Sequence, residues 1–486
     1  MADEKEMLQE YEAVIGVEIH AELSVKTKLF CSCPTAFGAT PNTQICPVCM
    51  GLPGAMPSLN AAAVECAVRA GAALGCKISP VSAFDRKNYY YPDLPKGYQI
   101  SQYFRPICTG GGLEIDTENG KKRIGITRIH MEEDAGKLIH SEKYGTLIDC
   151  NRCGVPLIEI VSEPDIRSGA EAAEFFRRIR AVLMYAGVTD GKMNEGSLRC
   201  DINLSVRKKG ETSLGVRTET KNLNSFRNVE KAAQCEFERQ VRLIKEGKTV
   251  EQETRRFDAD RGVTFPMRKK ESAEDYRYYP EPDLLPVILS DGETERIRRS
   301  LPEMPEERVK RYFDSYGIPA SDGALITAEP SVADWFESAA KVSRYPRICA
   351  NLVTAELLRR IEQGEKIPAA PSNFAAVADM AGEGEINSST AKKLAARLAK
   401  EDFEPRSYVR EKGLYQINSD EELRLFALSA VEESPSAVAD YIKGKDTASK
   451  AVVGKAMALS RGRANAEKLS LLVCALLEEK RVGGAR

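Results

Sequence analysis

The feature that most constrains the fold is a change of hydrophobic periodicity partway along the 486-residue chain. From about Tyr11 to Pro286, apolar and polar residues alternate in short runs between clusters of Gly, Pro and Asn, which is typical of strands and turns. From about Pro302 onward, helix-length segments rich in Ala, Leu, Arg and Glu replace this pattern. The sequence therefore predicts an α+β fold, in which a domain built on a mixed or antiparallel sheet precedes helical domains.

The chain is long enough for three domains of the usual size, about 100 to 200 residues each. We expect the first at 1–293, with helices at 170–187 and 224–247, and an all-α domain at 294–415. The segment EPRSYVREKGLYQIN then interrupts the run of predicted helices. After it, Ser419 and Glu422 have the spacing of a capping box that begins a new helix. A small helical tail domain is predicted at 416–486.

The tail carries a group of basic residues, which has two interpretations. The group is suited to contact RNA phosphates, and it is equally suited to solvate a small helical domain. The net charge of −2 does not help to choose between these interpretations, because any nucleic-acid binding would have to depend on a local basic face and not on the overall charge. The residues concerned are Lys443, Lys445, Lys450, Lys455, Arg461 and Arg463.

The cysteines indicate a metal site. The N-terminus lacks an apolar core and no later apolar run approaches the ~20 residues that cross a bilayer, so we expect a cytoplasmic protein with reduced thiols. Two close pairs, Cys31 with Cys33 and Cys46 with Cys49, are separated by 12 intervening residues in a turn-rich segment. This spacing predicts a structural Zn²⁺ site, with four free thiols as the alternative. Cys150 and Cys153 form a weaker CxxC signal, for which unmodified thiols are favoured over a second metal or redox site.

Acidic and imidazole side chains recur on the polar face of several predicted strands. In VIGVEIHAEL, alternation places Glu18 and His20 on the face opposite the apolar residues. Other strands add carboxylates in the same way, and such acids repel one another unless cations lie between them. Oxygen ligands with one imidazole suit Mg²⁺ or Mn²⁺. A plain solvated sheet face is the alternative. The further candidates are His130, Glu132, Glu133, Asp134, Asp201 and Glu219.

Cationic and amide groups near these strands are suited to a nucleotide triphosphate, because Mg²⁺ commonly bridges phosphate oxygens. The sequence shows no Walker-type loop and no recognisable glutaminase nucleophile, so any ammonia has to come from elsewhere. The candidates for nucleotide binding are Arg86, Lys87, Asn88, Lys221, Asn222 and Asn224.

At these residues the chain resembles the B-subunit family of the glutamine-dependent aspartyl/glutamyl-tRNA amidotransferases. The resemblance covers nearly the whole chain. It is carried by VIGVEIHAEL, the knuckle from Cys31 to Pro57, FDRKNYYYPDLPKGYQISQ, RIHMEEDAGKL, PLIEIVSEPD, NEGSLRCDINLSVR, TETKNLNSFRNVEKA and DYRYYPEPDLLP. The text DCNRCGVPL, with Cys150 and Cys153, departs from the family's usual pattern.

The resemblance implies an enzyme that uses ATP and Mg²⁺ to phosphorylate the side-chain carboxylate of Glu or Asp esterified to tRNA(Gln) or tRNA(Asn). Ammonia from a glutaminase, the A subunit, then displaces phosphate within a heterotrimer that also contains the C subunit. The resemblance also implies a YqeY-like tail domain that contacts tRNA. The catalytic residues carried over are Glu18, His20, Glu132, Glu133, Asp201 and Glu219, all but Glu132 as magnesium ligands, with ATP near Arg86, Lys87, Lys221, Asn222 and Asn224.

Two other classes of protein fit parts of the sequence. One is a non-catalytic, zinc-stabilised RNA-binding scaffold, in which the carboxylates only solvate a sheet. The other is a stand-alone metal-dependent ligase that acts on a small carboxylic acid. Dependence of ATP hydrolysis on mischarged tRNA separates these classes from an amidotransferase.

Overall fold

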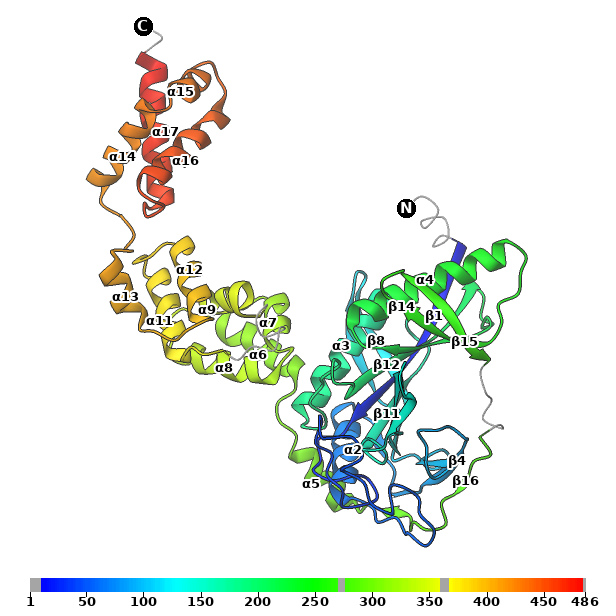
Figure 1. Ribbon diagram of the computed structural model, residues 1–486. Coiled ribbons are helices and arrows are strands. Elements are labelled where there is room, and N and C mark those ends of the chain that lie inside the picture. Colours follow the sequence, from blue (N-terminus) through cyan, green and yellow to red (C-terminus); the bar gives the residue numbers. More distant parts are fainter. Residues whose placement is uncertain (1–9, 270–275, 359–366, 484–486) are drawn as a thin grey trace. The chain divides into compact units, whose positions relative to one another are not determined.

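The computed structural model describes residues 10–269, 276–358 and 367–483. The chain divides into two compact units, Met1–Pro305 and Glu306–Arg486 (Figure 1). In the described residues, the first unit holds the sheets with several helices, and the second is helical. The predicted α+β fold is therefore confirmed.

The first unit is built around a ten-stranded sheet whose central strand is β1 (Tyr11–Glu22). On either side of it lie β12 (Leu198–Lys208) and β11 (Pro156–Ser162), both antiparallel to it. The pairing of β13 with β14 is parallel, so the sheet is mixed. The remaining strands are β13 (Thr218–Leu223), β14 (Glu253–Asp258), β15 (Val263–Lys269), β8 (Gly120–Glu133), β6 (Cys108–Thr109), β2 (Lys77–Ile78) and β7 (Gly112–Thr117).

Helices cover one face of this sheet. The side chains of Val17, Ile19 and Ala21 on β1 are buried in the core that the helices share with the sheet, as the alternation in the sequence predicts. The helices are α2 (Ala61–Ala73), α3 (Gly169–Tyr185) and α4 (Phe226–Lys245). Gly187 and Gly247 adopt φ near +68° and +69° just after α3 and α4, so both predicted helix ends are confirmed.

Smaller sheets complete the first unit. Strands β4 (Asp85–Asn88), β5 (Tyr98–Ser101) and β16 (Tyr279–Pro280) form a three-stranded sheet, in which β4 is central. Strand β3 (Val81–Ser82) pairs with β17 (Val287–Ile288). A hairpin joins β9 (Lys137–Ser141) to β10 (Gly145–Asp149).

Helix α5 (Asp291–Arg299) belongs to the first unit, so the units divide at Pro305 and not at the predicted 293. A full capping box at Ser290 and Glu293 begins the helix, and Ile297 is 2% exposed in the core of the first unit. The sequence of α5 is highly charged, like those of the helices that follow it. Its one buried apolar residue, Ile297, nevertheless packs in the core of the first unit, which also contains the apolar residues of the sheet.

The second unit contains two hydrophobic cores. The first includes Tyr312, Phe336 and Phe374, and the second includes Leu423 and Val473. Ser419 caps α14 through the backbone of Glu422. The helices are α6 (Pro305–Tyr316), α7 (Ala320–Ile326), α8 (Pro330–Ala340), α9 (Pro346–Leu352), the π-turn η1 (Val353–Leu357), α11 (Pro371–Gly382), α12 (Ser388–Leu398), α13 (Pro405–Lys412), α14 (Asp420–Glu432), α15 (Pro435–Ile442), the 3₁₀ turn η2 (Asp446–Ala448), α16 (Ser449–Leu459) and α17 (Ala466–Gly483).

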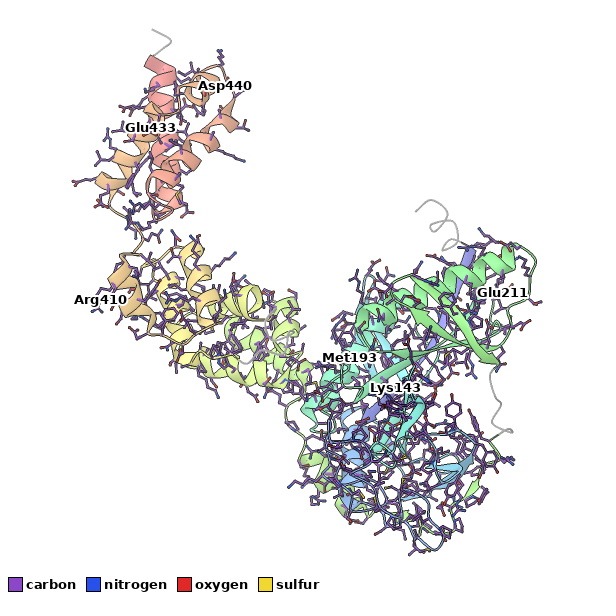
Figure 2. All side chains as sticks on the ribbon, in the orientation of Figure 1. Lys143, Met193, Glu211, Arg410, Glu433 and Asp440 are labelled. Carbon is purple, nitrogen blue, oxygen red and sulfur yellow. The ribbon has the colours of Figure 1, made fainter. Side chains whose placement is uncertain are left out.

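Two of the basic tail residues have acidic neighbours. Lys445 Nζ lies 3.1 Å from Asp440, and Lys455 Nζ lies 2.8 Å from Glu433; both acids are labelled in Figure 2. Across the described ranges, no helix combines the length and the apolar character that spanning a bilayer requires.

The position of Ile297 generates a stability prediction. Replacing Ile297 with Ala removes buried methyl groups and should lower the free energy of unfolding of the first unit by about 2 to 4 kcal/mol. Ile288→Ala is the matched control, because Ile288 is 74% exposed. Denaturant unfolding followed by far-UV circular dichroism measures the effect. The single tryptophan, Trp335, packs against the core of the second unit and reports that unit separately. We expect the two units to unfold independently, so the unfolding midpoint measured by Trp335 fluorescence should not change in Ile297→Ala. A shift of that midpoint equal to the one seen by circular dichroism would contradict this expectation.

Candidate active site

The polar face of the central strands collects the predicted site residues by register. Glu18 on β1 lies opposite Asp201 on β12, and His20 lies opposite Glu159 on β11. Glu159 in turn lies opposite His130 on β8. Side chains directly opposite one another in paired strands share a face of the sheet. The strands therefore bring acids and imidazoles into one row.

Within this row the side chains form two groups. His20, Glu132 and Glu159 are the imidazole group, and Glu18, Asp201 and Glu219 are the carboxylate group. In each group, one potential ligand atom per residue lies within 4.8 Å of the other two. Glu18 and His20 are two positions apart on β1, so the same strand contributes to both groups.

Charge is balanced within the imidazole group. His20 Nε2 lies 3.2 Å from Glu159 Oε2 and 3.6 Å from Glu132 Oε1. Burial lowers the pKa of His20, but the hydrogen bond and charge of Glu159 and the charge of Glu132 raise it overall, to about 9. Burial raises the pKa of Glu159, but His130 and His20 hold it well below the usual range. The His20 imidazole thus lies between two carboxylates, both of which favour its protonated form.

In the carboxylate group a lysine supplies the positive charge. Lys221 Nζ lies 3.2 Å from Asp201 Oδ2 and 3.1 Å from Glu219 Oε1. Asn203 donates a hydrogen bond of 2.8 Å to Glu18 Oε1. Burial, together with the nearby charges of Glu159, Glu219 and Asp201, raises the pKa of Glu18. One lysine therefore offsets part of the repulsion among three acids.

Both groups have donor sets that fit hard divalent cations. Carboxylate oxygens with one imidazole suit Mg²⁺ or Mn²⁺. A second histidine, His130, lies beside the imidazole group, with Nε2 3.6 Å from Glu159 Oε2. Its Nδ1 is buried and has no hydrogen-bond partner within the described parts of the chain. Since cation binding to His20 requires loss of its proton, the affinity of the imidazole group for metal should rise with pH.

Glu133, predicted as a magnesium ligand, joins neither group. It forms an ion pair with Lys96 and accepts a hydrogen bond of 2.9 Å from the backbone N–H of Ile100. Adjacent residues of a strand point to opposite faces, so Glu132 and Glu133 cannot both face the row. The structure brings Glu132 to the group and turns Glu133 away.

Of the predicted nucleotide-binding residues, some lie near the two ligand groups and others point away from them. The pKa of Lys87 is lowered by burial but raised overall by Glu132, neighbouring tyrosines and Glu159, so Lys87 lies within electrostatic reach of the imidazole group. Arg86 points elsewhere, with Nε 2.7 Å from Glu281 Oε2 and Nη2 3.0 Å from Asp283 Oδ2. Asn224 is exposed and accepts a hydrogen bond from Asn228. The side chain of Asn222 lies outside the described residues, and Asn88 bonds the carbonyls of Tyr276 and Arg277.

Glu159 is the member of the imidazole group that the sequence interpretation missed. It is the only charged residue in β11, PLIEIVS, and the strand is otherwise apolar enough to suggest burial on both faces. A lone acid in such a strand was the available signal, since isolated buried charges are rare unless paired.

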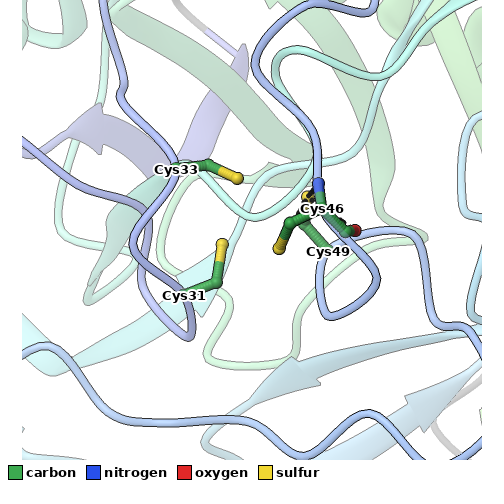
Figure 3. Close-up of side chains that lie close together, drawn as sticks. All are labelled: Cys31, Cys33, Cys46 and Cys49. Carbon is green, nitrogen blue, oxygen red and sulfur yellow. Dashed lines mark hydrogen bonds between the residues drawn. The ribbon is translucent and has the colours of Figure 1, made fainter.

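The four cysteines of the knuckle lie together (Figure 3). Their Sγ atoms are all within 4.8 Å of one another, and those of Cys46 and Cys49 are 3.9 Å apart. A tetrahedral Zn²⁺ site with bonds of ~2.3 Å places its sulfurs ~3.8 Å apart, so the arrangement fits the metal. The fully buried Lys28 has Nζ 3.5 Å from Cys49 Sγ. A hydrogen bond from Cys31, acting against burial and aided by Lys28, lowers the pKa of Cys49 to about 4.

Cys150 and Cys153 are buried next to the knuckle. Lys28 Nζ, which contacts Cys49, also lies 3.4 Å from the carbonyl oxygen of Cys150. Burial raises the pKa of Cys153, with Cys150 adding to the effect. All thirteen cysteines lie in the described ranges, and none forms a disulfide.

Comparison with known proteins gives matches over nearly the whole chain. The model of a family described as the GatB/GatE catalytic domain matches residues 13–295, and that of the GatB domain matches residues 334–477. The chain is 47% identical over 474 residues to the B subunit of the aspartyl/glutamyl-tRNA(Asn/Gln) amidotransferase of Thermodesulfovibrio yellowstonii, covering 97% of this chain and 100% of that protein. It is 48% identical to the B subunit of Caldanaerobacter subterraneus, over 95% and 98% of the two chains, and 45% identical to that of Caldicellulosiruptor saccharolyticus, over 97% and 100%.

Matches of this extent place the chain in the amidotransferase class, as one component of a glutamine-dependent carbon–nitrogen ligase. More particularly, it belongs to the GatB family. The resemblance noted in the sequence is thus confirmed.

The geometry of the knuckle predicts how metal content responds to mutation. Cys46→Ser should lower bound zinc well below one equivalent, because three thiolates leave the tetrahedral site incomplete. Cys235→Ser is the control, since Cys235 is a half-buried thiol on α4, away from the knuckle. Atomic absorption of the purified proteins measures the difference. Full zinc content in Cys46→Ser would exclude Cys46 as a ligand.

Proposed function

We propose that this chain is the kinase and transfer component of a tRNA-dependent amidotransferase. The γ-phosphoryl group of ATP passes to the side-chain carboxylate of Glu on tRNA(Gln), or of Asp on tRNA(Asn), with release of ADP. Ammonia then displaces phosphate and forms the amide. The printed names of the relatives, which specify both amino acids and both tRNAs, support this substrate class. We place the reaction in the cytoplasm.

The observation that carries the proposal is the pair of ligand groups on one sheet face. One strand, β1, contributes Glu18 to the carboxylate group and His20 to the imidazole group. Alternate residues of a strand are about 6.7 Å apart, so two cations would lie side by side. When bound, Mg²⁺ would screen the approaching anions and stabilise charge on the transferring phosphoryl group.

The residues of the chain itself would do the remaining work. Lys87 stays protonated beside the imidazole group and is suited to hold a phosphate or the substrate carboxylate. Lys221 already bridges Asp201 and Glu219, and a divalent cation there would release its ammonium toward the phosphates. Glu159 and Glu132 orient His20 through its Nε2.

The proposal includes partners. Ammonia would come from a separate glutaminase, the A subunit, which would form a heterotrimer with this chain and the C subunit. Support comes from the naming of the relatives as B subunits and from the lack of a recognisable glutaminase nucleophile in the sequence. The zinc knuckle would serve the fold and not the chemistry, because four thiolates leave no open position on the metal.

Glu159→Gln tests the site directly. The variant keeps the shape of the side chain but removes a charge from the imidazole group, so ATP-dependent amide formation by the assembled complex should fall at least a hundredfold. Glutamine hydrolysis by the same complex should change little. The exposed Glu163 provides a matched control, Glu163→Gln.

His20 is tested in the same way. Amide formation should fall in His20→Ala but not in His140→Ala, because His140 is an exposed histidine of the β9–β10 hairpin. Normal amide formation in Glu159→Gln and His20→Ala would refute the site.

Removal of residues 416–486 tests the tail. Lys443 and Lys450 are free of ion pairs to other described residues, and they remain available for phosphates. The truncated complex should bind tRNA more weakly, with a shallower dependence of affinity on salt, while its KM for ATP stays close to that of the full complex. Filter binding at several salt concentrations gives the affinity and its salt dependence. Unchanged tRNA affinity would remove the tail from the binding surface.

A further inference from the structure

A ladder of aromatic rings leads from the imidazole group to the surface of the first unit. Tyr276 and Tyr278 have ring centroids 6.0 Å apart, and Tyr278 is stacked on Tyr103 at 4.2 Å with an interplanar angle of 11°. Tyr103 then meets Phe104 edge to face at 5.1 Å. We call these four residues the aromatic ladder. They come from two segments far apart in the sequence.

The inner end of the ladder adjoins the imidazole group. Lys87 Nζ lies 4.8 Å from the ring centroid of Tyr276. Burial raises the pKa of Tyr278 to about 12, with Lys87 opposing and the charges of Glu132 and Glu159 adding to the increase. The Tyr278 hydroxyl is thus within electrostatic reach of the proposed metal ligands. A ligand on the ladder would lie next to the proposed phosphoryl-transfer site.

The outer end is exposed but held in place. The side chain of Phe104 is 58% exposed and that of Tyr103 is 36% exposed. The buried carboxylate of Asp85 accepts hydrogen bonds from the backbone N–H groups of both residues, at 2.7 and 3.0 Å. Asp85 lies on β4 two residues before Lys87, so one face of this strand fixes the rings and also presents the lysine. An exposed aromatic surface with a fixed backbone is suited to bind a flat ligand.

Positive charge lies beside the rings. The guanidinium carbon of Arg128 is 6.0 Å from the centroid of Tyr103. Arg128 forms no ion pair with any residue in the described ranges, and its Nε lacks a hydrogen-bond partner there. Aromatic faces combined with a free cation are the surface that unpaired nucleotides recognise, through base stacking and phosphate contact.

We propose that the aromatic ladder binds the 3′-terminal adenine of the aminoacyl-tRNA, which stacks against Tyr103 and Phe104. This proposal rests on the proposed function. There the reacting carboxylate is joined through a single amino acid to the ribose of the terminal adenosine. When the carboxylate reaches the imidazole group, the base has to lie immediately outside it, which is where the ladder reaches the surface. The adenine of ATP has the same chemistry, so the experiment has to separate the two sources.

The test uses the co-expressed complex and a tRNA that carries 2-aminopurine in place of the 3′-terminal adenine. Stacking quenches the fluorescence of this base. Quenching should occur with the unaltered complex and with Tyr103→Phe, which keeps the ring, and should be lost in Tyr103→Ala and Phe104→Ala. The matched control is Tyr144→Ala. Tyr144 is 65% exposed and also lies beside a cation, Lys143, which is labelled in Figure 2.

Kinetics complete the test. In Tyr103→Ala, the KM for aminoacyl-tRNA should rise about five- to a hundredfold while the KM for ATP stays constant. If Tyr103→Ala still quenches the fluorescence and has a raised KM for ATP, the ladder binds the nucleotide and the proposal is overturned. Unchanged KM values for both aminoacyl-tRNA and ATP would also overturn it. The fluorescence needs no chemistry. Quenching without any amide formation by the unaltered complex would therefore refute the proposed function and leave the stacking site standing.

Discussion

The repulsion among acidic side chains on one sheet face is the constraint on which the candidate active site depends. Glu18, Asp201 and Glu219 converge, and so do Glu132 and Glu159. Only a rigid scaffold holds such groups together, and the scaffold here is β1, paired antiparallel on both sides. A slip of β1 by one residue would turn Glu18 and His20 toward the hydrophobic core, so the helices that cover the opposite face also fix the register of this strand. The apolar core of the first unit thus maintains the polar site.

Cationic side chains offset the repulsion among these clustered acids. Lys221 lies between two acids of the carboxylate group, and the imidazole of His20 lies between two acids of the imidazole group, which favour its protonated form. Lys28 has the corresponding place beside the thiolate of Cys49. In each case a buried charge is stabilised by an opposite charge within 3 to 4 Å, as buried ions require. The proposed metal ions would enter by exchange, since a divalent cation would replace the proton of His20 or the ammonium group of Lys221.

Period-2 patterning was sufficient to predict which side chains gather on the polar face of the sheet. It placed Glu18, His20, Asp201 and Glu219 on one face, and the structure brings them into the two groups. It could not choose between Glu132 and Glu133, because the phase of a strand that ends there depends on its partners. It also missed Glu159, whose strand looks apolar until β1 and β8 are placed beside it.

The same limit explains the other differences. Arg86 and Lys87 are adjacent and both cationic, but only the pairing of β4 shows which one faces the acids. The first unit extends to Pro305 because Ile297, Leu301 and Met304 pack against its core, and the charged helical sequence around them concealed this. Local patterns predicted the elements and their faces. Contacts between distant segments decided which faces meet.

The ion pair between Arg86 and Glu281 joins residues 195 positions apart. It fixes β16 against β4, and the segment just before β16 supplies Tyr276 and Tyr278. During synthesis on the ribosome, the carboxylate row can begin to form once β12 and β13 have emerged, but the aromatic ladder has to wait for residues near 280. A nascent chain therefore assembles its carboxylate row well before its aromatic surface, and the candidate site becomes complete only when nearly all of the first unit has been made.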